Sequence, residues 1–429
     1  MSHFSLSIEK AKPAIIGLGY VGLPLALAFG KKYDLIAFDI SSDRISEISK
    51  GKDKTFEVEK ESLLNNIKCQ FTNDEKQLVH CNTYIITVPT PLKKTNKPDL
   101  SFLESASKLV GKFLDAGDVV IFESTVYPGV TEEFCAPIIE KISSLKYNKE
   151  FFVGYSPERI NPGDKSHRLK DIIKVTSGSN DSCANYVNDL YSSIITAGTY
   201  KAKDIKTAEA AKLIENVQRD INIALVNELA ILFKKLEINT KNVLETASTK
   251  WNFLSFKPGL VGGHCIGVDP YYLTHKAKEV DYNPKLILAG RKLNDDMANY
   301  VSENLMLELI KKHGLVSDLK ILIMGITFKE NCPDFRNTKV FDIFKFFKQK
   351  KLIVDVYDPI ADKKNVEFEL GIKLITNLKN SNYDAIIIAV GHNIFKEMGY
   401  DSIKKLGNKK TIIYDLKYIF PDNIKCLRL

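Results

Sequence analysis

Cysteine carries the most nucleophilic ordinary side chain, and one of the seven cysteines lies in a setting that suits chemistry. Cys265 is part of "GLVGGHCIGVDPYYL" (259–273), with two glycines just before it and Asp269 four residues after it. A free cysteine is most often a buried packing residue. The glycines and the Asp-Pro-Tyr-Tyr run instead favour a loop, on which a thiol is more accessible. Packing residue, metal ligand and nucleophile are therefore the alternatives for Cys265.

The other cysteines and the histidines do not indicate a metal site. The cysteines are widely spread without a CxxC pair, and the seven histidines show no HExxH spacing. A disulfide framework or a structural zinc site is therefore not expected, and we predict no metal.

A second chemical pattern stands near the N-terminus, in "AIIGLGYVGLPLALAFG". Gly17, Gly19 and Gly22 form GxGxxG directly after an apolar run and at the start of a helical one. In a dinucleotide site these glycines permit the tight turn, the approach of the pyrophosphate and close strand–helix packing. Asp39 ends the next apolar run, 17 residues beyond Gly22, where a carboxylate binds the adenosine ribose. The pattern predicts NAD rather than NADP, although nearby Arg44 could soften that preference.

A third pattern is a polar stripe within "AEAAKLIENVQRDINIALVNELA". At 100° per residue Lys212, Asn216, Arg219 and Asn227 fall within about 80° of one another on a helix whose other faces are largely apolar. A solvated face is the ordinary explanation of such a stripe. Asn is a poor choice for an exposed helix interior, so the stripe favours a site.

The elements that must position these residues form three regions. From Pro13 to about Thr199 six β-branched-rich runs alternate with helical segments, which predicts a parallel sheet covered on both sides. Lys201 to Lys257 contains no glycine or proline and predicts a long helix and at least one more, divided at Asn239 or Thr240. From about Val316 the alternation returns. We predict an α/β fold with two Rossmann-like domains, 1–200 for NAD and 306–429 for a second ligand, joined by a helical domain, 201–305.

Composition limits the class of protein. The 429 residues are 44% hydrophobic and 27% charged, and no apolar run approaches a membrane span. The net charge of +8 comes from lysine doublets spread along the chain, without a basic stripe or nucleic-acid-binding module. We expect a cytoplasmic protein that does not bind nucleic acid or membranes. Long helices without a sheet of their own favour a homodimer through the central domain.

The motifs taken together resemble those of the UDP-glucose/GDP-mannose dehydrogenase family over essentially the full length. They are, in the family's order, "GLGYVGLP", "VPTP", "ESTVYPG", "SPERINPG", "EAAKLIEN", "GGHCIGVDP" and "FKENCPDFRNT". The similarity is greatest to the bacterial branch that acts on UDP-N-acetylhexosamines, including the Vi-polysaccharide enzyme. The resemblance implies NAD-dependent, four-electron oxidation of a sugar C6 alcohol to a carboxylate, for capsule or O-antigen synthesis, by a homodimer.

The resemblance also implies roles for individual residues. Cys265 matches the nucleophile that forms a thiohemiacetal and then a thioester. Lys212 and Asn216 match the pair that stabilises the C6 oxyanion, and Asp269 the acid that works with the lysine. Thr125 and Glu158 match the pair that places and activates the hydrolytic water.

Two sets of binding residues follow from the same match. The cofactor set is Gly17, Gly19, Tyr20, Val21, Gly22, Asp39, Arg44, Pro89, Thr90, Ser124, Thr125 and Arg336. The substrate set is Glu158, Arg159, Ile160, Asn161, Lys212, Asn216, Arg219, Phe256, Gly259, Gly262, Arg291, Phe328 and Lys329. Within this set, the match implies that Phe328 and Lys329 bind the UDP-sugar. Arg291 is expected to complete a substrate pocket, either of its own subunit or of the partner across a dimer interface.

One departure bears on the substrate. The UDP-glucose branch commonly has a lysine before the loop's aspartate, whereas this chain has Val268. That difference favours UDP-GlcNAc or UDP-GalNAc over UDP-glucose, while the C4 epimer stays open. Alternatives are a UDP-glucose or UDP-ManNAc dehydrogenase, a two-electron dehydrogenase of the β-hydroxyacid type, and a non-catalytic NAD- and UDP-sugar-binding protein.

Overall fold

The computed structural model describes residues 4–55, 57–65, 68–160, 168–263, 265–314, 318–378 and 382–429 of the chain. They form two compact units. Unit 1 comprises Met1–Glu215 and Tyr271–Tyr282, and unit 2 comprises Asn216–Pro270 and Asn283–Leu429. The chain therefore crosses between the units three times, and the limits of the three predicted domains stay predictions.

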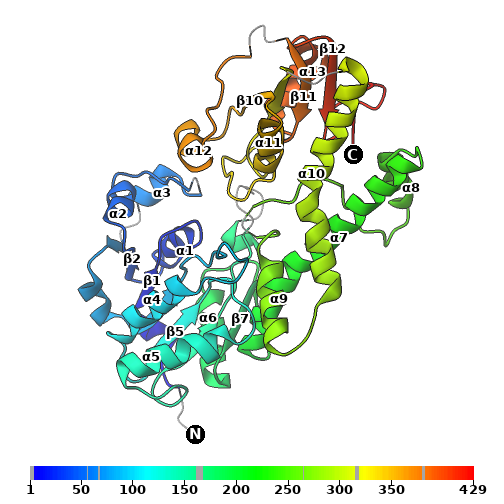
Figure 1. Cartoon of the computed structure of the whole chain (residues 1–429). Helices are drawn as coiled ribbons and strands as arrows, with labels where there is room; N and C mark the ends of the chain where they lie inside the picture. Colours follow the sequence, from blue (N-terminus) through cyan, green and yellow to red (C-terminus); the bar gives the residue numbers. More distant parts are fainter. Residues whose placement is uncertain are drawn as a thin grey trace. The chain divides into compact units, whose positions relative to one another are not determined.

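Unit 1 is built on an eight-stranded sheet of order β3-β2-β1-β4-β5-β6-β7-β8 (Figure 1). Every neighbouring pair is parallel except β6 and β7, which are antiparallel. The strands are β1 (Pro13–Ile16), β2 (Leu35–Phe38), β3 (Cys69–Thr72), β4 (Thr83–Ile86), β5 (Val119–Phe122), β6 (Phe152–Tyr155), β7 (Lys174–Gly178) and β8 (Thr199–Lys201).

Both faces of this sheet are buried, as near-continuous apolar strands require. Side chains alternate between the faces, so that Ile85 and Ile121 belong to one core, and Ile86 and Phe122 to the other. The helices of this part of the chain are α1 (Gly22–Phe29), α2 (Ser42–Ser49), α3 (Lys60–Leu64), α4 (Ser101–Gly111), α5 (Ala136–Ser143) and α6 (Asp181–Ser192). The predicted sheet, covered on both sides, is confirmed. Its expected all-parallel order is wrong for β7, the sixth predicted run, which pairs with β6 in the antiparallel direction, and β3 and β8 are additions to the six predicted runs.

Long helices follow the first sheet in the sequence. Helix α7 (Ile205–Lys235) begins in unit 1 and ends in unit 2, and α8 (Thr240–Ala247) follows it. The break falls at Asn239, whose side chain accepts a hydrogen bond from the Asn242 amide and caps α8. Helices α9 (Asp269–Glu279) and α10 (Lys285–His313) complete this region. The predicted long helix is confirmed, and of the two predicted break points, Asn239 and Thr240, the structure uses Asn239 as the cap.

The second sheet lies in unit 2 and has the order β10-β9-β11-β12, with all pairs parallel. Its strands are β9 (Lys320–Met324), β10 (Ile353–Tyr357), β11 (Tyr383–Ile388) and β12 (Gly407–Asp415). Helices α11 (Val340–Gln349), α12 (Lys363–Leu370) and α13 (Asn393–Lys404) connect them. The fold class is the predicted one: two Rossmann-like α/β regions with long helices between them in sequence.

The turn after the first strand of each α/β region has the same pattern of hydrogen bonds in both regions. Gly17 follows β1 with φ of 96° and Gly325 follows β9 with φ of 95°. The next residue's amide donates to the carboxylate that ends the neighbouring strand, at 2.8 Å for Asp39 and 2.7 Å for Asp358. In each case the carboxylate's other oxygen accepts from the amide two residues further along. The acid thus fixes the backbone at the switch point of each sheet.

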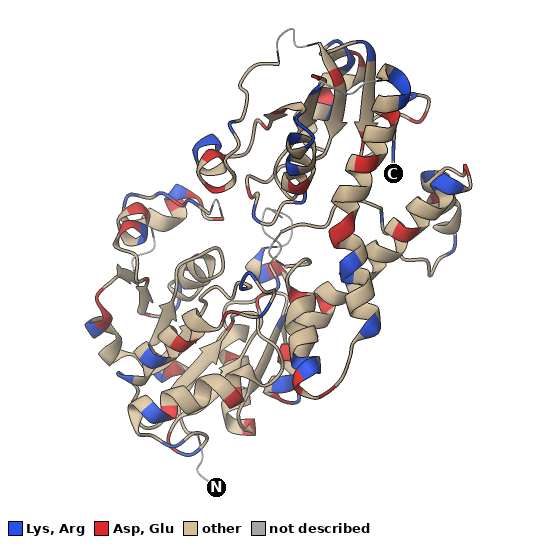
Figure 2. Cartoon of the chain, viewed as in Figure 1, with Lys and Arg blue, Asp and Glu red and all other residues tan. Residues whose placement is uncertain are grey.

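Charged side chains of both signs are interspersed over the chain (Figure 2). Within the ranges described above, no helix combines the length and hydropathy needed to cross a membrane. In the same ranges no three His, Cys, Asp or Glu side chains come together in a way that could hold a metal ion.

Candidate active site

The glycine-rich turn of unit 1 has the geometry of a dinucleotide cradle. Gly17 adopts a positive φ of 96°. A Cβ on Gly22 would collide with the Gly17 carbonyl and the Thr87 hydroxyl, so the helix can pack this closely only with glycine there. A Cβ on Gly19 would have no neighbour within 4 Å, which leaves that backbone open to a ligand. The three glycines therefore fit the pyrophosphate of NAD at the N-terminus of α1.

Asp39 lies at the end of β2, where a ribose-binding acid is expected. Its Oδ2 accepts from the Leu18 amide at 2.8 Å and its Oδ1 from the Ser41 amide at 2.9 Å. Each carboxylate oxygen has a second lone pair to offer to a hydroxyl. Arg44, in the first turn of α2, donates through Nε to the Leu18 carbonyl at 2.8 Å, so the backbone N–H and C=O of Leu18 are both held.

The remaining cofactor residues follow neighbouring parallel strands. Pro89 and Thr90 come after β4, and Ser124 and Thr125 after β5, so both pairs lie at the carboxyl edge that also carries the glycine turn. The Ser124 hydroxyl donates to the Val88 carbonyl at 2.6 Å, which ties the two loops together. Tyr20 and Val21 are part of the glycine turn itself, and both are partly exposed.

Glu158 follows β6 at the same edge and belongs to a buried ionic cluster. Its Oε1 accepts from the Arg159 amide at 2.6 Å and the Ile160 amide at 2.5 Å. Its Oε2 lies 3.2 Å from Nζ of Lys174, which also binds Glu123 at 2.7 Å. Burial disfavours the ammonium, but the two carboxylates outweigh it and raise the pKa of Lys174. One buried cation is thus shared between two acids.

Arg159 and Ile160 are both partly buried. The Arg159 side chain pairs with Glu215 at 2.8 Å and donates to the Ile173 carbonyl at 2.9 Å. The predicted substrate ligand Asn161 lies outside the described residues.

The predicted oxyanion residues lie on successive turns of α7, Lys212 in unit 1 and Asn216 in unit 2. Both side chains are buried. The Asn216 amide donates to Asp269, the first residue of α9, at 2.5 Å, and its Oδ1 accepts from the exposed Arg219 at 3.3 Å. Because both ends of the amide are engaged, its orientation is fixed, with one N–H still to offer.

Cys265 differs from most of the other cysteines in its surroundings. Burial raises the pKa of the thiols of Cys69, Cys81, Cys135 and Cys183 to about 12, which leaves them inert. Cys265 is only partly buried, and its carbonyl accepts from the first amide of α9 at 2.9 Å. Cys265 therefore lies shortly before the N-terminus of α9. Its side chain, like that of Cys426, is partly exposed, whereas the other five cysteines are buried.

The glycines before Cys265 pack against the predicted UDP-binding segment within unit 2. Gly263 has φ of 85°, and a Cβ there would lie 2.9 Å from the Phe328 ring. A Cβ on Gly262 would lie 2.8 Å from the Asn337 carbonyl, and the Asn337 side chain donates to the Gly263 carbonyl at 3.3 Å. Glycine is required at both positions, because the cysteine loop and this segment approach through their backbones.

A buried histidine holds the same segment. The Asn331 amide donates to Nδ1 of His392 at 2.9 Å, so Nε2 carries the proton and faces Asp358 at 3.2 Å. The Thr327 hydroxyl donates to the carbonyl of Lys329, which is partly exposed. These hydrogen bonds hold the backbone of segment 326–331, which carries Phe328 and Lys329.

Two polar residues of the central helices serve a buried network. Asn227 donates to the Gly259 carbonyl at 3.0 Å and to Asn294 at 2.8 Å, and accepts from the Gly259 amide at 2.7 Å. Arg291 is buried and binds Asp220 at 2.5 Å and Asp295 at 3.3 Å. These contacts give Asn227 and Arg291 a structural explanation, and the substrate role of Arg291 stays a prediction.

Arg336 and Phe256 complete the predicted set. Arg336 is exposed, and its side chain pairs with Asp334 at 2.5 Å. Phe256 is partly buried in the segment that leads to the buried Gly259. Their predicted contacts with cofactor and sugar stay predictions.

Some residues that hold the site escaped the sequence analysis. Lys174 and Glu123 were missed, although an acid ending the apolar strand "VVIFE" was a usable signal. Glu209 was also missed: its buried carboxylate accepts from the amides of Gly129 at 2.6 Å and Thr131 at 2.9 Å, which anchors α7 to the loop after Thr125. Burial raises the pKa of Glu209 to about 7.

Comparison with known proteins agrees with the geometry. Three domains of the UDP-glucose/GDP-mannose dehydrogenase family match the chain: the NAD binding domain over residues 11–195, the central domain over 206–296 and the UDP binding domain over 322–422. The first contains the glycine cradle, and the third contains the segment held by His392. The cofactor of the first domain is therefore NAD.

The chain is also similar to individual proteins over nearly its full length. It is 54% identical to a UDP-N-acetyl-D-glucosamine 6-dehydrogenase of Salmonella typhi, covering 98% of this chain and 99% of the relative. It is 52% identical to Protein CapL of Staphylococcus aureus, covering 95% of each. A UDP-D-ManNAc dehydrogenase structure from Pyrococcus horikoshii superposes with a TM-score of 0.87 at 32% identity, covering 97% and 98%. The chain belongs to the UDP-glucose/GDP-mannose dehydrogenase family.

Proposed function

We propose that the protein is an NAD-dependent UDP-N-acetyl-D-glucosamine 6-dehydrogenase that oxidises the sugar C6 alcohol to a carboxylate. The observation that carries the proposal is the packing of the Cys265 loop. Its two glycines close onto Phe328, in the region matched by the family's UDP binding domain. A thiol held next to a sugar-nucleotide segment explains why the reaction proceeds past the aldehyde. Identity of 54% to a relative of that name supports the choice of substrate.

The first half of the reaction makes an aldehyde. NAD supplies the oxidant, accepting one hydride from C6 in each of two oxidations. Lys212 and Asn216 face the negative charge that develops on O6, and the Asp269 bond keeps the free N–H of Asn216 directed. An aldehyde cannot lose a second hydride until a nucleophile adds to it, so Cys265 adds to C6 as the thiolate.

The second half makes the acid. With NAD bound as the hydride acceptor, oxidation of the thiohemiacetal on Cys265 would give a thioester on the same sulfur. Thr125 and Glu158 position a water, Glu158 takes its proton, and the water displaces the Cys265 thiol to leave the carboxylate. In total one alcohol, two NAD and one water give one carboxylate, two NADH and three protons. Lys174 keeps the Glu158 carboxylate in place throughout.

A product-counting experiment tests the function. Purified protein is given NAD in excess and limiting UDP-GlcNAc, UDP-GalNAc, UDP-ManNAc or UDP-glucose, and NADH is counted per sugar. Two NADH per UDP-GlcNAc, with slower turnover of the others, is the expected result. One NADH per sugar would contradict the thioester route and favour a two-electron dehydrogenase. If no sugar gives NADH, the alternative of a non-catalytic NAD- and UDP-sugar-binding protein would be favoured.

A cysteine pair separates the thiol's role from general damage. Cys265→Ala should abolish formation of the carboxylate, whereas Cys426→Ala, at the other partly buried cysteine, should keep both stoichiometry and rate. Full carboxylate formation by the Cys265 variant would contradict the proposal.

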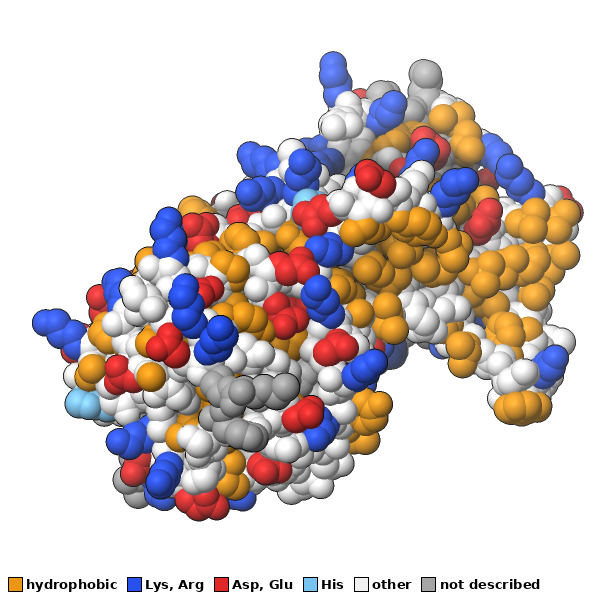
Figure 3. Space-filling model, turned by 90° about the horizontal axis from the view of Figure 1, so that it is seen from below, with side chains coloured by type: hydrophobic (Ala, Val, Ile, Leu, Met, Phe, Trp, Pro, Cys, Tyr) orange, Lys and Arg blue, Asp and Glu red, His pale blue; other side chains and the backbone are white. Residues whose placement is uncertain are grey.

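The proposal extends to assembly as a homodimer through the central helices. Figure 3 shows hydrophobic side chains gathered on the side where α7, α8 and α10 lie in Figure 1. The exposed large apolar residues of this region include Leu225, Leu232, Leu236, Trp251, Leu254 and Leu286. An apolar patch of this kind favours a protein interface. Sedimentation of the wild-type protein should show a dimer. The Leu232→Glu variant should shift the equilibrium towards monomer. A monomeric wild type would contradict the proposed homodimer.

We further propose that the reaction takes place in the cytoplasm and supplies a uronic acid for a surface polysaccharide. None of the seven cysteines, all of which lie in the described ranges, forms a disulfide, which is typical of a reducing compartment. Loss of the polysaccharide on deletion of the gene, restored by the wild type and not by the Cys265→Ala variant, is the expected outcome.

A further inference from the structure

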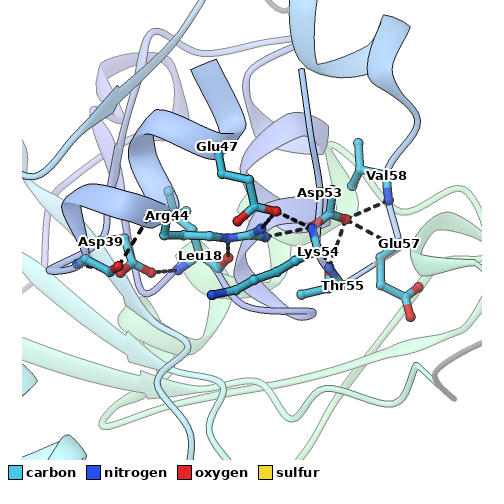
Figure 4. Close-up of polar contacts among 10 residues, drawn as sticks. Leu18, Asp39, Arg44, Glu47, Asp53, Lys54, Thr55, Glu57 and Val58 are labelled. Carbon is cyan, nitrogen blue, oxygen red and sulfur yellow. Dashed lines mark hydrogen bonds and ion pairs between the residues drawn. The ribbon is translucent and has the colours of Figure 1, made fainter. Parts of the chain in front are cut away.

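Arg44 is an arginine at a position where Rossmann domains that bind NADP place a cation for the 2′-phosphate. It lies five residues after Asp39, where an arginine can pair with the 2′-phosphate of NADP. Here the Arg44 side chain is buried, with only 3% of its surface exposed. Besides the Leu18 carbonyl it binds Glu47 through Nη1 at 3.3 Å and Asp53 through Nη2 at 2.8 Å (Figure 4). Three of its five N–H donors are therefore committed.

Asp53 is itself held firmly by the loop that contains it. It accepts from the amide and hydroxyl of Thr55 at 3.0 and 2.8 Å, and from the amides of Glu57 and Val58, each at 3.0 Å (Figure 4). Burial opposes ionisation, yet the hydrogen bonds from Arg44 and Thr55 lower the pKa of Asp53. Asp53 is thus a fixed anion at neutral pH, and it draws the Arg44 guanidinium towards its own loop.

The charges in this cluster disfavour a phosphate. One guanidinium faces two carboxylates, Glu47 and Asp53, while the carboxylate of Asp39 accepts from the Leu18 amide. Recognition of a phosphate by arginine needs a fork of adjacent N–H donors directed at it. The fork of Arg44 is already directed at carboxylates, and the net charge of these four side chains is negative.

We propose that Asp53 is a specificity-determining residue of the cofactor site. By anchoring the Arg44 guanidinium it withholds that cation from the 2′-phosphate, and so makes the site select NAD over NADP. Asp39 repels the 2′-phosphate directly, whereas Asp53 acts through Arg44. The simpler alternative is that Asp53 only stabilises its own loop.

Cofactor binding and turnover in full-length Asp53→Asn test the proposal. The amide is isosteric and removes the anion. Calorimetry with NAD and NADP, in the absence of sugar, gives the two Kd values, and turnover at a fixed UDP-sugar concentration gives kcat/KM for each. We expect the preference for NADP relative to NAD to rise by about tenfold in both measurements. An unchanged preference, with only a lower melting temperature, would overturn the proposal and leave Asp53 as a loop-stabilising residue.

Two further variants test the route through Arg44. Arg44→Met combined with Asp53→Asn should lose the gain; a gain that persists without the arginine would overturn the proposal. Arg44→Met alone should weaken the binding of NAD and of NADP by the same factor, since the wild-type arginine does not contact the 2′-phosphate. A selective loss of NADP binding would also overturn it, and this variant keeps the test decisive if Asp53→Asn fails to fold. Binding needs no sugar, so a wrong assignment of the sugar would leave these measurements intact.

Discussion

The buried amide of Asn227 offers a quantitative test of how the sugar loop is held. Asn227→Ala removes three hydrogen bonds, to the Gly259 carbonyl, the Gly259 amide and Asn294, at 2.7–3.0 Å. Both backbone groups of Gly259 are left buried without that partner, at about 1–3 kcal/mol for each group. We expect the free energy of unfolding of unit 2 to fall by about 3 kcal/mol, which for a unit of this size lowers Tm by roughly 6–12 °C.

The assay pairs calorimetry with kinetics. Scanning calorimetry should show the shift in the transition that belongs to unit 2. Steady-state kinetics should show a raised KM for the UDP-sugar and an unchanged KM for NAD, because Gly259 leads to the glycines that close on Phe328. Asn222→Ala is the matched control: Asn222 lies on the same helix, and its amide donates to the Gln218 carbonyl within that helix. Equal effects of the two substitutions, or a larger change in the KM for NAD, would refute the reasoning.

Other buried groups give further predictions. Lys174→Met strands two buried carboxylates and should destabilise the protein by about 3–5 kcal/mol, whereas Lys170→Met, at an exposed lysine, should change stability little; equal melting curves would contradict this. The pKa of Glu209 is raised by burial from 4.5 to about 7, so the folded protein holds a proton that the unfolded chain has lost, and stability should fall by roughly 3 kcal/mol between these pH values. Glu209→Gln should remove that slope in denaturant titrations at several pH values, and an unchanged slope would assign it elsewhere. His392→Gln loosens segment 326–331 and should weaken UDP binding in calorimetry without changing NAD binding; parallel losses would point to general unfolding.

Local patterns predicted the parts of the structure that depend on local chemistry. The glycine turn, Asp39 at the strand end and the cap at Asn239 each follow from a few neighbouring residues, and each is where the sequence placed it. The periodicity of apolar runs likewise predicted two α/β regions. The prediction that β7 runs parallel to its neighbour was wrong, because the apolar composition of a strand marks its presence and not its direction.

Partners distant in sequence could not be predicted. Lys174 looks like an ordinary surface lysine before an apolar run, and only the fold brings it to Glu123, 51 residues earlier. Arg44 illustrates the same limit: its position after Asp39 suggests a ligand for NADP, while Asp53, in the next loop, decides where it points. Asn227 shares a helical face with Lys212 and Asn216, but its amide binds Gly259. A shared face alone does not distinguish a ligand from a buried network.

The turn that occurs in both α/β regions changes what an acid at a strand end can be taken to mean. Asp39 and Asp358 make equivalent backbone hydrogen bonds, yet the positions of Gly19 and Gly22 are taken by Thr327 and Glu330 in the second region. The acid is therefore a property of the chain's path at that turn, independent of which ligand lies there. A search that scores the acid would count two dinucleotide sites in this protein. The glycines carry the diagnostic information, because they alone record how closely a phosphate must approach.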